Sequence, residues 1–315
     1  MTSLIAAIDI GGTKIAGALV DRDGRLTARC LRPTPAKEPA EQVLHAVTEV
    51  LDELRADPRW ADVRCVGLGS AGPIDAPKGA VSPVNIPAWR GFPLVDALRE
   101  HLGNDGLPIV LTGDGPAMTA AEHWVGAARG FRNALCMVVS TGVGGGLILD
   151  GALYPGPSGN AGHIGHISVD LDGDPCPCGA RGCVEILASG TAIARRALAE
   201  GWHPPGDDAS AAAVAQSARA GDPVALASFA RAAKALAAGI AATATLVELD
   251  VVVIGGGVAL SGELLFAPLR SALRDYATLP YVQGLELRAA ELGTDAGVVG
   301  AAAAAAEVVA VDGWG

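Results

Sequence analysis

Residues 4–20 read LIAAIDIGGTKIAGALV, two apolar runs separated by a short polar turn. The first run, Leu4–Ile10, ends at Gly11-Gly12 and the second begins at Ile15, which predicts two buried strands joined by a tight glycine turn. Arg25–Leu31 follows as a third strand. Further along the chain we expect a loop rich in Pro and Gly at Gly72–Gly91 and helices at Leu94–Leu102, around Val184–Ala199 and at Glu263–Tyr276. A buried hairpin at the start of an α/β chain is therefore the feature around which the rest of the sequence is arranged.

The turn has the composition of a phosphate site. Gly11 and Gly12 let backbone N–H groups turn toward an anion, Thr13 adds a hydroxyl donor, and Lys14 adds positive charge. Asp9, just before the turn, is suited to hold Mg²⁺ through water molecules. An ordinary hairpin turn is the alternative, because the spacing is neither that of a Walker A loop nor that of a Rossmann fingerprint.

The same pattern starts again in the middle of the chain. Strand Ala134–Ser140 leads through a glycine-rich turn into strand Leu147–Leu149, and a later strand, Val251–Ile254, also ends in glycines. Any one such turn is usually only structural, but three at strand ends predict a duplicated domain with a nucleotide held between its halves. The candidate nucleotide-binding residues of the two later turns are Thr141, Gly142, Val143, Gly144, Gly145, Gly255, Gly256 and Gly257.

Length, hydropathy and charge limit the class of protein. A chain of 315 residues, half of them apolar, has room for about two domains. It contains no unbroken apolar run that reaches bilayer length and no secretion signal, so we expect a cytoplasmic protein without a membrane partner. The net charge of −11 disfavours nucleic acid as a partner.

Asp114 stands between an expected strand, Ile109–Leu111, and an expected helix, Ala117–Ala127. One interpretation makes it the N-cap of that helix, which Asp and the nearby Pro116 both suit. The other makes it a general base that takes a proton from an attacking hydroxyl. The two interpretations are compatible, because a capping position also fixes the carboxylate.

Three cysteines and a histidine are grouped where a metal would be expected. In a chain without a secretion signal, such a cluster indicates metal before disulfide, and three sulfurs with one nitrogen complete a tetrahedral shell for a structural Zn²⁺. His163 is a competing nitrogen ligand, and Glu185 is either a first-turn helix acid or a polyol contact anchored by the zinc loop. The expected ligands are His166, Cys176, Cys178 and Cys183.

Together these motifs resemble the ROK family (repressors, open reading frames and sugar kinases), and the resemblance covers essentially the whole chain. It implies an actin-like, ribonuclease-H-like α/β fold whose two domains close around a central cleft holding a sugar and ATP. It also implies transfer of the γ-phosphoryl group to a hexose 6-hydroxyl, with Mg²⁺ and a structural Zn²⁺, in a homodimer or homotetramer. The motifs that carry it are Asp9–Lys14, Ser140–Gly146, Ala161–His166, Cys176–Glu185 and Gly255–Gly257.

The resemblance also assigns roles and domains. It makes Asp114 the catalytic base. It divides the chain into a smaller domain, 1–113 with a C-terminal helix at about 296–315, and a larger domain, 114–295, that carries the zinc loop. The implied sugar contacts are Gly72, Asn85, Asp114, His163, His166 and Glu185.

Two residues depart from the glucokinases of this family. Gly113 stands where they usually carry Asn, and His163 stands where they usually carry Glu. The form of Ala161–His166 is similar to that of bacterial N-acetylmannosamine kinases, whereas the missing amide suits a sugar modified near O3 or O4, such as kanosamine. We therefore expect an amino sugar as substrate, with glucose as the alternative. A ROK-type regulator and a non-catalytic sugar-binding protein are further alternatives, which the acidic charge and the intact phosphate turns oppose.

Overall fold

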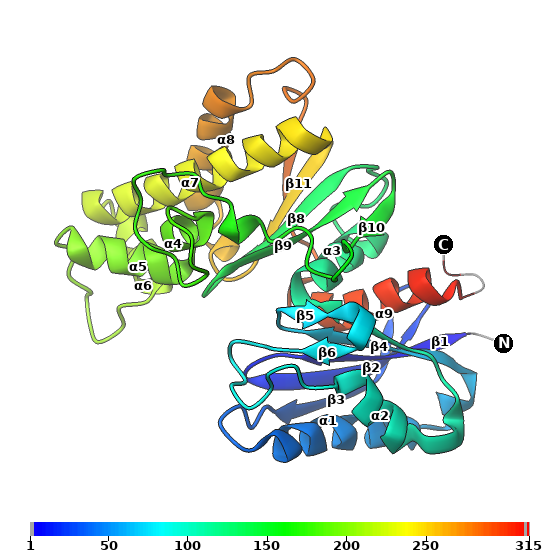
Figure 1. Ribbon diagram of the computed structural model, residues 1–315. Helices are drawn as coiled ribbons and strands as arrows, with labels where there is room; N and C mark the ends of the chain where they lie inside the picture. The colour runs from blue at the N-terminus through cyan, green and yellow to red at the C-terminus, as the bar shows by residue number, and fades with distance from the viewer. Residues whose placement is uncertain (1–2, 312–313, 315) are drawn as a thin grey trace.

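Two five-stranded mixed sheets, one in each half of the chain, organise the computed structural model, which describes residues 3–311 and Trp314 (Figure 1). The first sheet has the order β3-β2-β1-β4-β7, formed by β1 (Leu4–Ile10), β2 (Lys14–Asp21), β3 (Leu26–Pro33), β4 (Val63–Ser70) and β7 (Ile109–Gly113). The second has the order β10-β9-β8-β11-β12, formed by β8 (Ala134–Val139), β9 (Val143–Leu149), β10 (Ala152–Tyr154), β11 (Val251–Gly255) and β12 (Glu286–Ala289).

The two sheets have the same topology. In each, the first three strands pair antiparallel, and the two later strands run parallel to the first. The duplication predicted from the repeated glycine hairpin is therefore confirmed. A short extra hairpin, β5 (Ile74–Asp75) with β6 (Ala80–Val81), lies within the expected loop Gly72–Gly91.

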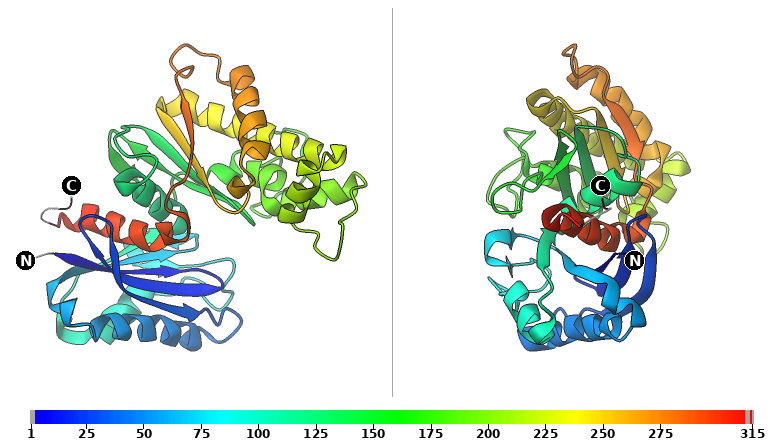
Figure 2. Two further views of the ribbon diagram at one scale, coloured as in Figure 1. Left: turned by 180° about the vertical axis from the view of Figure 1, so that it is seen from behind. Right: turned by 90° about the vertical axis from the view of Figure 1, so that its right-hand side faces the viewer.

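Helices cover both sheets. On the first sheet, α1 (Ala40–Arg55) and α2 (Leu94–Leu102) bury one face, and α9 (Ala296–Val309) buries the other (Figure 2). Between α9 and the second sheet lies α3 (Asp114–Val125). The far face of the second sheet is covered by α4 (Val184–Ala188), α5 (Gly190–Ala199), α6 (Ala211–Arg219), α7 (Pro223–Val247) and α8 (Glu263–Tyr276).

The central helix α3 is packed at backbone distance on two sides. A Cβ added at Gly300 of α9 would lie 1.7 Å from the carbonyl oxygen of Ala117, and one added at Gly115 would lie 2.4 Å from that of Gly145 in β9. Only glycine at these two positions allows the helices and the strand to approach so closely. The N-terminus of α3, where Asp114 lies, is therefore held firmly between the two sheets.

By length and composition, α7 is the one described helix that could cross a membrane. In the structure, 61% of its most apolar stretch is buried. Its buried residues belong to the core of the larger domain, together with those of β8 and α8. This burial is typical of a core helix.

Three local predictions were wrong. Gly144–Gly146 lie inside β9 instead of preceding it, because the strand passes so close to its neighbours that a Cβ at Gly145 would lie 2.8 Å from the carbonyl oxygen of Cys136. The helix expected over Val184–Ala199 is broken at Ser189, which has an extended backbone and accepts a hydrogen bond from the N–H of Ala192. Asp114 is the first residue of α3, so Gly113 is the N-cap.

We propose the domain division 1–113 with about 296–315 against 114–295, because α9 packs on the first sheet. Residues 1–2, 312–313 and 315 of this division lie outside the described residues. The final helix ends at Val309.

Candidate active site

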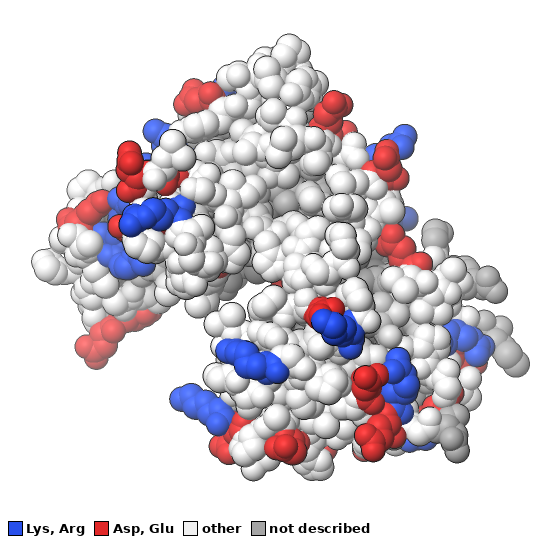
Figure 3. All heavy atoms as spheres, in the orientation of Figure 1, with Lys and Arg blue, Asp and Glu red and all other residues white. Residues whose placement is uncertain are grey.

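The carboxyl ends of parallel strands bring two acids together between the domains. Within the parallel set β1-β4-β7, Asp9 pairs with Gly69, which pairs with Thr112, so Asp9 and Asp114 come to the same edge of the sheet. Figure 3 shows the surface hollowed between the smaller domain and the α5–α6 end of the larger one.

Both carboxylates have a raised pKa. Burial, with a smaller contribution from the charge of Asp114, raises the pKa of Asp9 to about 6 against the opposing charge of Lys14. Burial also raises the pKa of Asp114, although one side of its side chain is open to the cleft. The hydrogen bond from the Gly115 N–H, and to a smaller extent the nearby His163, lower that pKa. The Gly115 N–H donates to Asp114 Oδ1 at 2.8 Å and leaves the other oxygen to accept a proton.

Asp9 fits the role of a magnesium-binding acid. A Cβ at Gly297 of α9 would lie 2.3 Å from Asp9 Oδ2, so glycine there leaves the carboxylate its space. Burial raises the pKa of this carboxyl although the charge of Lys14 lowers it, so a bound cation would stabilise its ionised form. A hard oxygen donor of this kind beside a phosphate turn suits Mg²⁺ held through its own waters.

The first glycine turn is braced from the smaller domain. The N–H of Gly11 donates to the carbonyl of Lys14 at 3.0 Å, and Thr34 Oγ1 donates to the carbonyl of Gly11 at 2.7 Å. Asn85 lies directly over the turn, since a Cβ at Gly12 would be 2.3 Å from Asn85 Nδ2. Asn85, expected to contact the sugar, therefore lies against the phosphate turn.

The second turn is held by α5 and by Glu185. Ser140 N–H donates to the carbonyl of Gly142 at 2.9 Å, and the hydroxyl of Thr191 donates to the carbonyl of Thr141. Glu185 Oε2 accepts from the N–H of Val143 at 2.9 Å, and a Cβ at Gly142 would lie 2.6 Å from the same oxygen. Glu185, the acid expected to bind the sugar, therefore holds the second glycine turn.

A cavity of about 520 Å³ adjoins this turn and has the size of a nucleoside site. Gly257 lines it, whereas Gly255 belongs to β11 and Gly256 (φ +90°) shapes the turn behind it. Thr141, also predicted, lines the cavity as well, whereas sequence reasoning missed the walls that come from α5, α6, α7 and the 3₁₀ turn after β11. They include Thr191, Ala194, Ser210, Ala211, Arg219 and Leu260.

The sulfur and nitrogen ligands predicted for zinc come together. Their donor atoms all lie within 4.8 Å of one another; Cys178 Sγ is 3.7 Å from Cys183 Sγ, and Cys176 Sγ is 3.9 Å from His166 Nδ1. Ligand atoms around tetrahedral zinc, with Zn–S near 2.3 Å, are separated by roughly 3.8 Å. The cluster is therefore consistent with a structural zinc, which would have no open coordination position.

The remaining sugar-site candidates surround Asp114. His163 Nε2 would be 3.8 Å from a Cβ at Gly72, which places the imidazole across the cleft from the smaller domain. At Gly113 the backbone (φ −69°) suits any residue, and a Cβ there would meet Pro116 Cδ at 3.4 Å and the carbonyl oxygen of Gly159 at 3.7 Å. A Cβ at Gly113 would therefore fit without a clash.

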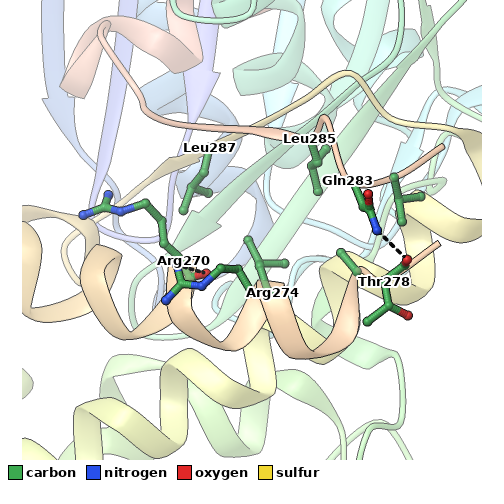
Figure 4. A pocket seen from close by; sticks show the side chains of 9 residues that line it. Arg270, Arg274, Thr278, Gln283, Leu285 and Leu287 are labelled. Atoms are coloured by element: carbon green, nitrogen blue, oxygen red, sulfur yellow. Dashed lines mark hydrogen bonds between the residues drawn. The ribbon is translucent and has the colours of Figure 1, made fainter. Parts of the chain in front are cut away.

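A second cavity, of about 410 Å³, lies between α8 and β12 (Figure 4). Leu285 and Leu287 line one side of it, and Arg270 and Arg274 of α8 lie on the other. Neither the glycine turns nor Asp114 line this cavity, so it is separate from the candidate active site.

Duplicated hairpins that each end in a glycine turn, two acids at the cleft and a nucleoside-sized cavity beside the second turn define an actin-like, two-domain nucleotide-binding protein. A model of the ROK family matches residues 5–308, and the chain belongs to that family. The chain is 36% identical to a glucokinase of Thermotoga maritima, over 95% of this chain and 96% of the relative. It is 38% identical to an N-acetylmannosamine kinase of Yersinia pseudotuberculosis, over 94% and 96%.

A crystal structure of a ROK family glucokinase from Streptomyces griseus, in complex with glucose and AMPPNP, is similar to the whole fold. It superimposes with a TM-score of 0.78 at 35% identity and covers 95% of this chain and 98% of that one. The actin-like fold predicted from the sequence is therefore confirmed.

Proposed function

We propose that the chain is an ATP-dependent hexose kinase that phosphorylates the 6-hydroxyl of an amino sugar, with N-acetylmannosamine and the 3-amino sugar kanosamine as the leading substrates. The observation that carries the proposal is the placement of Asp114, with one oxygen held by Gly115 and the other open, beside His163 and at the same sheet edge as the first phosphate turn.

The chemistry needs alignment and charge neutralisation more than covalent work by the protein. Asp114 accepts the proton of the sugar 6-hydroxyl as the hydroxyl oxygen attacks the γ-phosphorus of ATP; the bond from that phosphorus to the β,γ-bridging oxygen breaks and ADP leaves. Lys14 and the N–H groups of the two turns hold the phosphates from both sides. Mg²⁺, held through water by Asp9, would neutralise the charge of the transferred group.

The preference for an amino sugar rests on two positions, Gly113 and His163. Glucokinases of the family usually place an amide at Gly113 and a carboxylate at His163, and both would hydrogen-bond sugar hydroxyls. The backbone at Gly113 suits any residue and a Cβ there would meet no atom closer than 3.4 Å, so the backbone does not impose glycine at this position. In a closed site, a sugar hydroxyl that has lost its hydrogen-bonding partner weakens the preference for that sugar by about 1–3 kcal/mol. The absence of the amide and the carboxylate therefore supports a modified hexose over glucose.

Glucose is the alternative substrate, because similar relatives carry both names. The test is kcat/KM with ATP and Mg²⁺ for glucose, mannose, N-acetylglucosamine, N-acetylmannosamine and kanosamine. We expect one of the amino sugars to give the highest value. A protein that prefers glucose over every amino sugar would replace the proposal with a glucokinase.

The double variant Gly113→Asn/His163→Glu tests the cause of the preference. It should shift kcat/KM toward glucose while the KM for ATP stays the same, because neither position touches the phosphate turns. An unchanged ranking of the sugars would separate substrate choice from these two residues.

Two further properties belong to the proposal. A non-catalytic regulator or binding protein would bind sugar without hexose-dependent ATP turnover, which a coupled ADP assay detects directly. We also propose a cytoplasmic homodimer or homotetramer, a state that light scattering measures.

A further inference from the structure

A loop of the larger domain is fastened to the smaller domain beside the sugar site. This strap, residues 155–162, follows β10 and lies against the hairpin β5–β6 (Figure 1). Asn160 Oδ1 accepts from the N–H of Ile74 at 3.1 Å, and Asn160 Nδ2 donates to the carbonyl of Ile74 at 2.7 Å. The amide thus pairs with Ile74 as a neighbouring strand would.

A second contact and close packing support the same attachment. The N–H of Ala76 donates to the backbone carbonyl of Ser158 at 3.0 Å. Gly159 (φ +89°) packs so tightly that a Cβ there would lie 2.8 Å from Ile74 Cδ1. Three successive residues of the strap, Ser158–Asn160, are therefore attached to β5 and to the residue that follows it.

The same asparagine also holds His163. The backbone carbonyl of Asn160 lies 2.7 Å from His163 Nδ1. A carbonyl oxygen can only accept, so Nδ1 carries the hydrogen, and Nε2 of the neutral ring is left as an acceptor. Nε2 lies on the Gly72 side of the ring, within the cleft.

We propose that Asn160 is a positioning residue for sugar recognition. Through its amide it fixes the strap on the smaller domain, and through its carbonyl it fixes the ring plane and the Nδ1–H tautomer of His163. The imidazole that contacts the sugar is thereby held by both domains at once. Nε2 of the neutral imidazole offers its lone pair to a hydrogen-bond donor of the sugar, such as a hydroxyl or an amide N–H. This inference rests on the proposed placement of the sugar beside Asp114 and His163.

A merely structural role for Asn160 makes different predictions. If the amide only stabilised the loop, its removal would change sugar and ATP parameters together, and its effect would add to that of losing His163. If Asn160 acts through His163, the two losses are coupled, and the double variant is no worse than the single His163 variant.

The first experiment is a double-mutant cycle of Asn160→Ala and His163→Ala in the zinc-loaded protein. We expect Asn160→Ala to raise the KM for the sugar about 5- to 10-fold and to leave the KM for ATP within about twofold, as befits one or two lost hydrogen bonds. Asn160→Ala/His163→Ala should match His163→Ala. The control Ser158→Ala removes a hydroxyl 3.1 Å from Asn160 Nδ2 but keeps the Ile74 contacts, and it should behave as the unaltered protein.

Other results would overturn the proposal. Additive effects, or equal changes in both KM values, would leave Asn160 with a structural role alone. A sugar KM that responds to His163→Ala but not to Asn160→Ala would refute the role of Asn160 and leave the proposed function intact. A sugar KM that ignores His163→Ala would refute the placement of the sugar and with it the role of Asn160.

The second experiment needs no variant that has to fold. In ¹⁵N-histidine spectra of the unaltered protein, assigned with His163→Ala, the neutral His163 should show a protonated Nδ1 and a bare Nε2. A protonated Nε2 with a bare Nδ1 would contradict the hydrogen bond on which the proposal depends.

Discussion

Asp9→Asn should make the metal-free protein more stable while it impairs catalysis. A pKa raised from 3.8 to about 6 means that ionised Asp9 costs the folded state about 3 kcal/mol relative to a carboxylate in water. Asparagine has nearly the same shape and removes the charge. Above about pH 6 the variant should therefore gain up to this amount of unfolding free energy.

The pH dependence follows from the direction of the shift. The folded protein retains the Asp9 proton up to about pH 6, whereas the unfolded chain loses it near the ordinary value of 3.8. The destabilisation by Asp9 therefore appears as the pH rises through this interval and is complete above it. Urea unfolding in buffer without Mg²⁺, with the zinc retained, at several pH values between about 5 and 8 should show the gain from Asp9→Asn increasing with pH and then levelling.

A matched control is Asp207→Asn, which removes an exposed carboxylate from a loop of the larger domain. It should change stability by less than about 0.5 kcal/mol. Equal stability of Asp9→Asn and the unaltered protein at pH 8 would refute the reasoning. A gain of the same size at every pH would show that something other than the charge had changed.

Three other variants test the rest of the site and the fold. Asp114→Asn should bind the sugar but lose most of kcat, and near-normal turnover of this variant would exclude Asp114 as the base. Because the pKa of Asp114 is raised, the kcat of the unaltered protein should fall on acidification at a higher pH than an ordinary aspartate would give. Cys183→Ser should release zinc, which metal analysis measures, and an intact zinc content would contradict the ligand set. The variant should also raise the KM for both sugar and ATP, because Glu185, next to the zinc loop, also holds the second phosphate turn. Gly300→Ala should lower the unfolding free energy by about 2 kcal/mol or more, since its Cβ would meet the carbonyl of Ala117 at 1.7 Å. Gly284→Ala, which meets nothing within 4 Å, should be neutral.

Much of the fold could be predicted because its signals are local. The apolar run Leu4–Ile10 and the helical spacing in Leu94–Leu102 and Glu263–Tyr276 were predicted with the bounds that the structure has. Ser189 was missed although a serine followed by a glycine is a common helix start, because the apolar spacing continues across it. Periodicity describes what a segment buries, and it says little about where a cap interrupts it.

The site was predictable where the residues that act together are close to one another in the sequence. The glycine turns, Asp114 and the cysteine cluster are each short motifs whose chemistry is contained in neighbouring residues. Asn160 and the cavity walls Thr191 and Arg219 are different, because their partners come from distant parts of the chain. The residues next to each of them in the sequence do not indicate such contacts.

The position of α9 in the fold has a consequence for how the chain is made. The face of the first sheet formed by Ile5, Ala7 and Cys65 is covered by residues of α9, such as Ala301 and Ala305. During synthesis, the first sheet emerges early, but the helix that covers this face emerges after the whole larger domain. Until then an apolar sheet surface stays bare, which is the kind of surface that chaperones bind and that aggregates form from. The earliest part of the chain is therefore among the last to finish folding.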